Sequence, residues 1–305
     1  MLLASAVSLV SCRDELPRGE GYTFTDDTGR TLSVGEVKRA AVLFSSFAEV
    51  WTLAGGEVTI TVGESVERGF ADAEALLVDG GAGKSINEEL LLAYAPDFIL
   101  YSADIPAQVR AAALISEQTG IPAAGFCVEC FEDYLRLLKV CTSILHTPER
   151  YEAYGENMRL EIEALRTAPV VGEVKSILFI RSGQSARSAK AKTAEEHFAC
   201  AMLKELGTYN IAENARVLLD GLSVEEILRE NPDLIFVSTM GDEAGAQAYM
   251  QSVFAEDAWQ TLDAVQNGSV FFLPKELFQY KPNARWAEAY RYLADIVRGG
   301  CDGEA

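Results

Sequence analysis

The residues best suited to bind a charged ligand lie in one short segment. Arg181, Arg187, Lys190 and Lys192 all fall within "RSGQSARSAKAK", residues 181–192, in a chain whose net charge is −20. Guanidinium and ammonium groups attract anions and donate charge-assisted hydrogen bonds to them. The segment therefore predicts contact with an anionic ligand. It is alternatively a solvated loop that balances nearby acids. Arg181, at the end of an expected strand, is the first candidate.

Other candidates follow from their position after an expected strand. In open α/β sheets, ligands bind at the carboxyl ends of the strands. The loops 63–70 and 275–281 come after strands in this way. Rings in the second loop suit stacking on a planar ligand, or closing the edge of a lobe instead. The candidates on these grounds are Ser45, Ser46, Ser102, Met240, Phe278 and Tyr280.

The cysteines argue against a metal held by the protein itself. Cys127 and Cys130, in "CVEC", have the spacing of a redox pair or of half a zinc site. The chain has no second Cys-x-x-Cys and only two histidines, so we expect no structural zinc. Phe131 follows Cys130, which excludes a Cys-x-x-Cys-His haem attachment. The two thiols are read as a structural pair or as free small residues, and their oxidation state stays open.

Several function classes lack their signatures. Neither a Gly-x-Ser-x-Gly elbow nor a dinucleotide-binding glycine pattern occurs after an expected strand. "GGAGKS", residues 80–85, echoes a phosphate-binding loop, but Val78 stands where its first glycine belongs. A strongly acidic chain is also unsuited to nucleic acid, whose binding depends on neutralising phosphates. We therefore expect neither an enzyme nor a nucleic-acid-binding protein.

The N-terminal stretch is typical of export. Residues 2–11 of "MLLASAVSLVSC" are uncharged and mostly apolar, which is shorter than the about 20 residues of a membrane-spanning helix and fits a signal peptide. "LVSC" resembles a bacterial lipobox, with Cys12 as the lipidated residue and "RDELPRGEG" as a tether. No Lys or Arg precedes the apolar run, which leaves open a true start upstream of Met1. We expect a lipid anchor at Cys12 on the outer face of a bacterial cytoplasmic membrane.

The elements that would position the candidate residues form one pattern, used twice. "NEELLLAYAPDFILYS" (87–102) and "SVEEILRENPDLIFVS" (223–238) each predict a capped helix, a Pro-Asp pair that ends it and a buried strand. Each copy lies within alternating strands and helices. The sequence therefore predicts two Rossmann-like α/β lobes with a ligand cleft between them.

A single charged helix is expected between the lobes. "TPERYEAYGENMRLEIEALRTA", residues 147–168, has a capping Thr147 followed by Pro148, and charges on most faces. Such a helix often bridges domains through solvent, and Gly155 weakens it by about 1 kcal/mol, so packing at its ends would hold it. The expected parts are a signal peptide and tether (1–21), an N-terminal lobe (22–146), the linking helix (147–168) and a C-terminal lobe (169–305).

These features together resemble the helical-backbone class of ABC-transporter substrate-binding proteins, which capture iron–siderophores, haem and cobalamin. The resemblance runs from "FTDDTGRTLSV" and "RAAVLF", through both Pro-Asp units, to "AWQTLDAVQNGSVFFLP" and the last helix. No single motif is diagnostic; the order of the motifs, the lipobox and the lone linking helix carry it.

The resemblance implies a cargo and partners. The expected function is capture of an iron chelate, a ferric siderophore or haem, by a monomer without a cofactor of its own, and delivery to an ABC permease and its ATPase. A cobalamin-binding protein and a signalling module on the same fold are the alternatives, although the basic segment argues against cobalamin. For haem, possible axial ligands are Met240, Tyr280 and His197, the last of which better fits a packed helix residue.

The resemblance also implies how the protein docks. In this family each lobe presents a surface glutamate to arginines of the membrane subunits. Glu89 and Glu225, each seven residues before its Pro-Asp proline, are the expected pair, with Glu88 and Glu226 as their neighbours. All four alternatively just favour helix N-termini. A rigid helix that crosses once between lobes implies only small hinge motion on loading.

Overall fold

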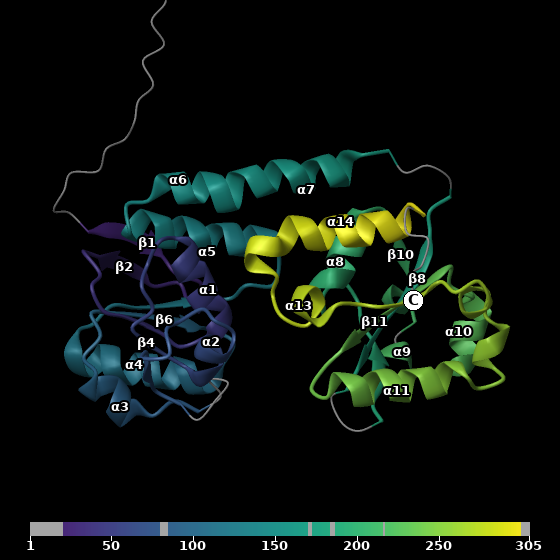
Figure 1. The fold of residues 1–305 in the computed structure, drawn as a ribbon, viewed down its shortest axis with the longest axis horizontal. Helices are drawn as coiled ribbons and strands as arrows, with labels where there is room; N and C mark the ends of the chain where they lie inside the picture. Colours follow the sequence, from purple (N-terminus) through teal and green to yellow (C-terminus); the bar gives the residue numbers. More distant parts are fainter. Residues whose placement is uncertain (1–20, 80–84, 170–172, 184–186, 216, 300–305) are drawn as a thin grey trace, which may run out of the picture.

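Two α/β lobes lie side by side and are bridged on one side by a long helix (Figure 1). This computed structural model describes residues 21–79, 85–169, 173–183, 187–215 and 217–299. Cys12 and the "GGAGK" part of residues 80–85 lie outside those ranges. The predicted fold class is confirmed: each lobe has a largely parallel sheet with helices packed against it.

The N-terminal lobe begins with a hairpin and continues with a parallel sheet. The hairpin predicted from the alternation in residues 22–34 is present, with Tyr22 opposite Val34. The sheet has the strand order β5-β4-β3-β6-β7. Every residue of β6 is buried, as expected for a central parallel strand covered on both faces. The strands are β1 (Tyr22–Thr25), β2 (Thr31–Val34), β3 (Ala40–Val42), β4 (Ile60–Thr61), β5 (Leu76–Leu77), β6 (Phe98–Ser102) and β7 (Ala123–Phe126).

The helices of this lobe begin and end where the local chemistry predicts. The Asn87 side chain caps α3 by accepting a hydrogen bond from the Leu90 N–H at 3.0 Å. Gly120, with φ of 75°, ends α4 in the left-handed region that favours glycine. The helices are α1 (Ser45–Leu53), α2 (Gly63–Glu67), α3 (Glu88–Ala93), α4 (Pro106–Thr119) and α5 (Phe131–Ile144).

The C-terminal lobe has the strand order β10-β8-β11-β12, with β9 antiparallel to β8. Within the segment 181–192, expected as a loop, residues 181 and 182 instead continue β8 and residues 189–191 form β9, so that Ile180 faces Ala191. The expectation of a loop was wrong because β9 supplies backbone partners to the outer part of β8. The strands are β8 (Ser176–Ser182), β9 (Ala189–Ala191), β10 (Tyr209–Asn210), β11 (Leu234–Thr239) and β12 (Val270–Phe272).

One helix of this lobe, α8, begins directly after His197. The ring nitrogen Nδ1 of His197 accepts a hydrogen bond from the Ala199 N–H at 3.2 Å, which makes His197 the cap of α8. None of the helices within the described ranges is long and apolar enough to cross a bilayer. The helices are α8 (Phe198–Glu205), η2 (Ile211–Glu213), α9 (Val217–Asp220), α10 (Val224–Glu230), α11 (Glu243–Phe254), η3 (Trp259–Thr261), α12 (Asp263–Gln266), α13 (Lys275–Phe278), η4 (Asn283–Arg285) and α14 (Trp286–Val297).

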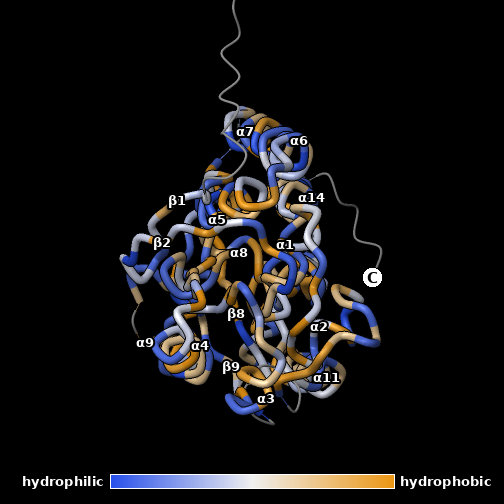
Figure 2. The backbone as a smooth tube through the Cα atoms, turned by 90° about the vertical axis from the view of Figure 1, so that its left-hand side faces the viewer, coloured by the Kyte–Doolittle hydropathy of each residue, from blue (hydrophilic) through white to orange (hydrophobic). Residues whose placement is uncertain are grey.

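The linking helix packs along its length, so the expectation of a solvent-bridging helix polar on all faces was wrong. It consists of α6 (Pro148–Tyr151), a π-helical turn η1 (Glu152–Glu156) and α7 (Asn157–Thr167). Met158 and Ile162 are buried. Figures 1 and 2 show the helix lying across α5 and α14, one from each lobe.

A shared hydrophobic core joins the lobes beneath this helix. Trp286, at the start of α14, is fully buried. Its ring centroid lies 6.0 Å from that of Phe131 in the N-terminal lobe and 5.6 Å from that of Phe198 in the C-terminal lobe. Buried residues of both lobes belong to this one cluster, while each sheet has a second cluster on its other face. In Figure 2, hydrophobic residues gather in this interior, around α8 and β8.

The repeated Pro-Asp pair has a structural role that is the same in both lobes. The Asp97 carboxylate accepts hydrogen bonds from the backbone N–H groups of Lys38 (2.8 Å) and Arg39 (3.0 Å), just ahead of β3. The Asp233 carboxylate accepts one from the Ser176 N–H (2.7 Å) at the start of β8. Each aspartate thus fixes the start of the strand beside its own, which explains why the pair occurs twice.

Candidate functional site

The β8–β9 hairpin gathers cations on one face. Arg181 lies directly opposite Lys190 in the antiparallel register. The Lys192 N–H donates to the Phe179 carbonyl at 3.0 Å. Because side chains alternate along a strand, Phe179, Arg181, Lys190 and Lys192 lie on the same side of the hairpin. That side belongs to the core shared by the lobes, through Phe179. Like charges placed opposite each other destabilise a sheet, and an anion bound between them would offset that repulsion.

Arg181 has donor capacity to spare. Its Nε is buried and has no hydrogen-bond partner among the described residues. Burial lowers the pKa of the guanidinium, and the nearby charge of Glu129 opposes that shift. Burying a guanidinium whose N–H lacks an acceptor costs free energy, and a bound anion would supply that acceptor.

His197 reports how closely the cations are grouped. Its ring stacks between Phe179 and Phe198, with centroids 4.7 and 4.9 Å away. Burial, and then the charges of Arg181, Lys281 and Lys192, lower the pKa of His197 to about 3. The charges of all three cations therefore act on His197. His197 itself is a neutral, packed capping residue.

The segment after α13 brings further cations to the boundary between the lobes. The Arg68 guanidinium, at the end of α2 in the N-terminal lobe, lies 4.2 Å from the centroid of the Tyr280 ring. The Nζ of Lys275 lies 5.9 Å from the same ring. The Nζ of Lys281 lies 5.0 Å from the Phe198 ring. We call Arg68, Arg181, Lys190, Lys192, Lys275 and Lys281 the basic cluster; it draws on both lobes.

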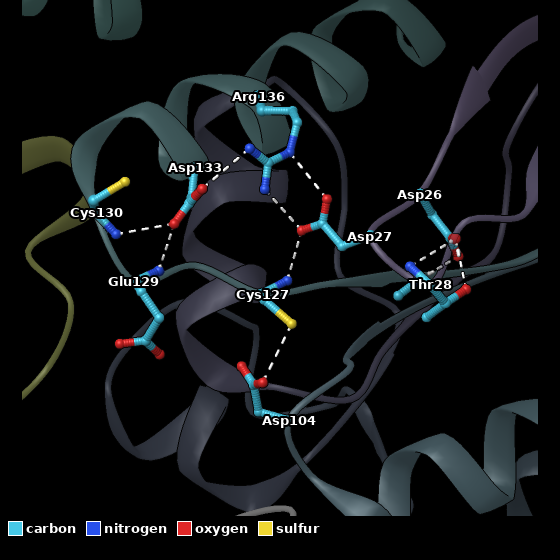
Figure 3. Close-up of polar contacts among 10 residues, drawn as sticks. Asp26, Asp27, Thr28, Asp104, Cys127, Glu129, Cys130, Asp133 and Arg136 are labelled. Atoms are coloured by element: carbon cyan, nitrogen blue, oxygen red, sulfur yellow. Dashed lines mark hydrogen bonds and ion pairs between the residues drawn. The ribbon is translucent and has the colours of Figure 1, made fainter. Parts of the chain in front are cut away.

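A carboxylate from the N-terminal lobe reaches into this cluster. Glu129 Oε2 pairs with Lys281 Nζ at 2.8 Å. Figure 3 shows the polar network that holds the loop carrying Glu129. Asp133 Oδ2 accepts from the N–H groups of Glu129 (2.9 Å) and Cys130 (3.1 Å). Arg136 bridges Asp133 and Asp27, and Asp27 accepts from the N–H of Cys127, so the loop is fixed at several points.

The two thiols of this loop are free cysteines. The Cys127 thiol donates to Asp104 Oδ1 at 3.2 Å, and in Figure 3 the two sulfur atoms point in different directions. Burial, followed by the nearby carboxylates, raises the pKa of Cys127 to about 12 and that of Cys130 to about 11. Both thiols are therefore protonated at neutral pH. Within the described ranges, no three His, Cys, Asp or Glu side chains are placed to hold a metal ion.

Four expected ligand contacts lie in the packed interior. Ser45 is fully buried, donates to Glu64 Oε2 at 2.7 Å and accepts from Arg68 at 2.9 Å. The Ser46 carbonyl accepts from the Asn283 side chain at 2.9 Å. The other two are Ser102, buried at the end of β6, and Phe278, fully buried and packed against Tyr292. Side chains committed in this way offer no open face to a ligand.

The remaining candidates follow β8, β11 and α13 in the C-terminal lobe. Arg187 is exposed and lines a cavity of about 740 Å³ along α11, together with Asp242 and Tyr249, so it lies apart from the paired part of the hairpin. Met240 is half-buried, and its N–H donates to the Ser182 carbonyl at 2.8 Å. Tyr280, half-buried beneath Arg68, is the aromatic candidate that meets the basic cluster.

Sequence reasoning missed four residues of this region. Arg68, Lys275 and Lys281 fall within loops singled out above for following strands, but nothing in the sequence shows that those loops meet. Glu129 carried no signal, because one more acid in an acidic chain is unremarked.

The glutamates expected to dock lie at equivalent places in the two lobes. Glu89 in α3 and Glu225 in α10 are exposed, in the first turn of helices that precede the equivalent strands β6 and β11. Among described residues neither carboxylate is in an ion pair, whereas Glu226 pairs with Arg229. Figure 1 shows both helices on the half of the molecule away from the linking helix.

Comparison with solved structures finds the same fold. The petrobactin-binding protein YclQ of Bacillus subtilis has a TM-score of 0.68 at 19% identity, covering 93% of this chain and 100% of its own. FeuA of Bacillus subtilis, solved with ferri-bacillibactin, scores 0.66 at 17%, covering 90% and 98%. The haem-binding protein RhuT of Roseiflexus scores 0.66 at 15%, covering 86% and 98%. No curated protein sequence matches the chain.

The sequence itself matches a family model over most of its length. The model, described as periplasmic binding protein, aligns with residues 41–277, which include both lobes and the linking helix. A match over more than half of the chain establishes membership. The chain therefore belongs to the periplasmic binding protein family, as a substrate-binding protein of an ABC importer and not as an enzyme.

Proposed function

We propose that this protein captures an anionic iron chelate, a ferric siderophore or haem, between its lobes and delivers it to an ABC permease. The observation that carries the proposal is the basic cluster, assembled from both lobes in a chain of net charge −20. Such a cluster raises the local concentration of anions and offers charge-assisted hydrogen bonds. Tyr280 adds a ring suited to an aromatic chelate.

Two related proteins support an iron chelate as cargo. YclQ binds petrobactin and FeuA was solved with ferri-bacillibactin, and both share this fold. Haem remains within the proposal, because RhuT binds it on the same fold. Neutral cobalamin gains less from the basic cluster, so it is the weaker alternative.

The anchor and the docking residues complete the proposal. Lipidation at Cys12 would hold the protein at the outer face of the cytoplasmic membrane, near its permease. Glu89 from one lobe and Glu225 from the other would then contact basic residues of the permease, which works together with its ATPase. Two separated carboxylates fix orientation and speed encounter more than they add affinity.

The test is a binding titration of the purified protein by tryptophan fluorescence, with a ferric tris-catecholate complex, haem and cyanocobalamin. We expect saturable binding of an iron chelate, weakened about ten-fold by Arg181→Gln, since a hydrogen bond to a charged group contributes about 1.5 kcal/mol. Lys38→Gln, which removes an exposed charge paired with Glu36, is the control and leaves affinity unchanged. Saturable binding of cyanocobalamin alone would replace the iron proposal with the corrinoid one.

A further inference from the structure

Carboxylates already occupy parts of the basic cluster: Glu196 pairs with Lys192 at 3.3 Å from within the C-terminal lobe, and Glu129 comes from the other lobe. Glu129 pairs with Lys281 across the boundary between the lobes, and its charge also acts on Arg181. Lys281 is mostly covered, with 20% of its side chain exposed, whereas 69% of the Glu129 side chain is exposed. The cation is thus fixed in the structure, and the anion lies at its open side.

The loop fixes the backbone of Glu129 but leaves its side chain free to turn. Asp27 accepts from the N–H of Cys127, Asp133 accepts from the N–H of Glu129, and Arg136 pairs with both carboxylates, as Figure 3 shows. Among the described residues, the Glu129 carboxylate accepts a hydrogen bond from the Lys281 ammonium at 2.8 Å. Because the Glu129 end of this single ion pair is open to solvent, the pair contributes little free energy, and the side chain can leave Lys281 without disturbing the loop.

We propose that Glu129 is an internal counter-anion that occupies the basic cluster in the empty protein and is displaced by an anionic group of the ligand. This inference rests on the proposed function for the place where the ligand binds. The displaced carboxylate returns to solvent, and the ligand anion takes over Lys281 together with the unpartnered Nε of Arg181.

Displacement would make the site selective for charge. A neutral ligand cannot replace a carboxylate at Lys281, so it must bind beside an intact ion pair. A polyanionic ligand replaces one ion pair with several, and the additional ion pairs make its binding free energy more favourable. Specificity of this kind is a difference between two affinities, and Glu129 sets it by competing with weak anions.

The experiment compares Glu129→Gln with the natural protein in titrations of a ferric tris-catecholate complex and of cyanocobalamin. Removing the competitor should tighten binding of the trianionic complex about three-fold at low salt, with a smaller gain at high salt, and leave the neutral corrinoid unchanged. Glu132→Gln is the matched control. It removes the same charge three residues along the chain, and the Glu132 carboxylate pairs with Arg166 instead of with the basic cluster. Equal or weaker binding of the complex by Glu129→Gln overturns the proposal.

A second readout separates this inference from the proposed function. Acylation of Lys281, followed by mass spectrometry, is measured with increasing citrate, a trianion that carries no iron. Citrate should protect Lys281 at about three-fold lower concentration in Glu129→Gln than in the natural protein. If no iron chelate binds but this shift occurs, the proposed cargo fails and the counter-anion stands. If citrate protects both proteins equally, the counter-anion fails whatever the cargo is.

Discussion

At the scale of single residues, His197 links the basic cluster to stability. Its imidazole stays neutral in the folded protein, since burial and neighbouring cations hold its pKa at about 3 against an ordinary value of 6.5. The unfolded chain takes up a proton below about pH 6.5. The contribution of His197 is thus fully present above that pH and is lost as pH falls towards 3, by up to about 1.4 kcal/mol per pH unit.

Urea unfolding between pH 7.5 and 4.5 measures this loss. His197→Asn keeps a capping acceptor but cannot take up the proton, so its unfolding free energy should fall less steeply with decreasing pH. Asn87→Ala, which removes the cap of α3 and no titratable group, is the control and should keep the natural slope. Identical slopes for all three proteins would contradict the account.

The sequence located cations that share one face, but it could not predict side-chain direction, and ligand contact by these cations stays a prediction. Arg181, Lys190 and Lys192 were identified because cations are scarce in this chain, and they do share one face. Ser45 and Phe278 also follow strands, yet both side chains turn inward. A position after a strand fixes where a residue lies along the chain but not which way its side chain points.

At the scale of elements, Gly155 determines how closely the linking helix approaches α5. A Cβ there would lie 3.2 Å from Leu135 Cδ2 and 3.3 Å from Leu138 Cδ2. Gly155→Leu should therefore destabilise the protein by about 2 kcal/mol through overpacking, measured by chemical denaturation. Ala153→Leu adds similar bulk at an exposed position of the same helix and should change stability by less than about 0.5 kcal/mol. A neutral Gly155→Leu would show that the helix is free to shift.

Element boundaries were predictable where one local cause decides them. Asn87 begins α3 as a side-chain cap, and Gly120 ends α4 in the left-handed region. The sequence does not show that the linking helix packs, because its many charges obscure an apolar stripe that includes Met158 and Ile162. This stripe is buried only because α5 and α14 lie beneath the helix. Strand β9 was missed because three residues with two alanines and a lysine carry no strand pattern of their own.

At the scale of the whole molecule, Trp286 makes the two lobes one cooperative unit. It packs against Phe131 of one lobe and Phe198 of the other. Trp286→Ala should cost about 3 to 5 kcal/mol and split the calorimetric transition in two, because each lobe keeps a core behind its sheet. Trp259→Ala removes an equally buried indole from the C-terminal core alone and is the control for lost volume. A single transition for Trp286→Ala would show that other contacts couple the lobes.

The shared core also bears on how the two lobes would meet a permease. Glu89 and Glu225 belong to different lobes, and lobes joined through Trp286 and the linking helix hold them at a nearly constant spacing. Glu89→Arg and Glu225→Arg should each slow association with the permease by about three- to ten-fold at low salt, without changing cargo affinity. Because a rigid spacing lets each site act independently, the two losses should multiply in the double variant. Glu117→Arg reverses an exposed charge on α4 and should leave the association rate unchanged. Surface plasmon resonance on permease in nanodiscs measures the association rates of all four variants. Loss of cargo affinity in either docking variant would show that the substituted glutamate contributes to cargo binding and not to docking alone.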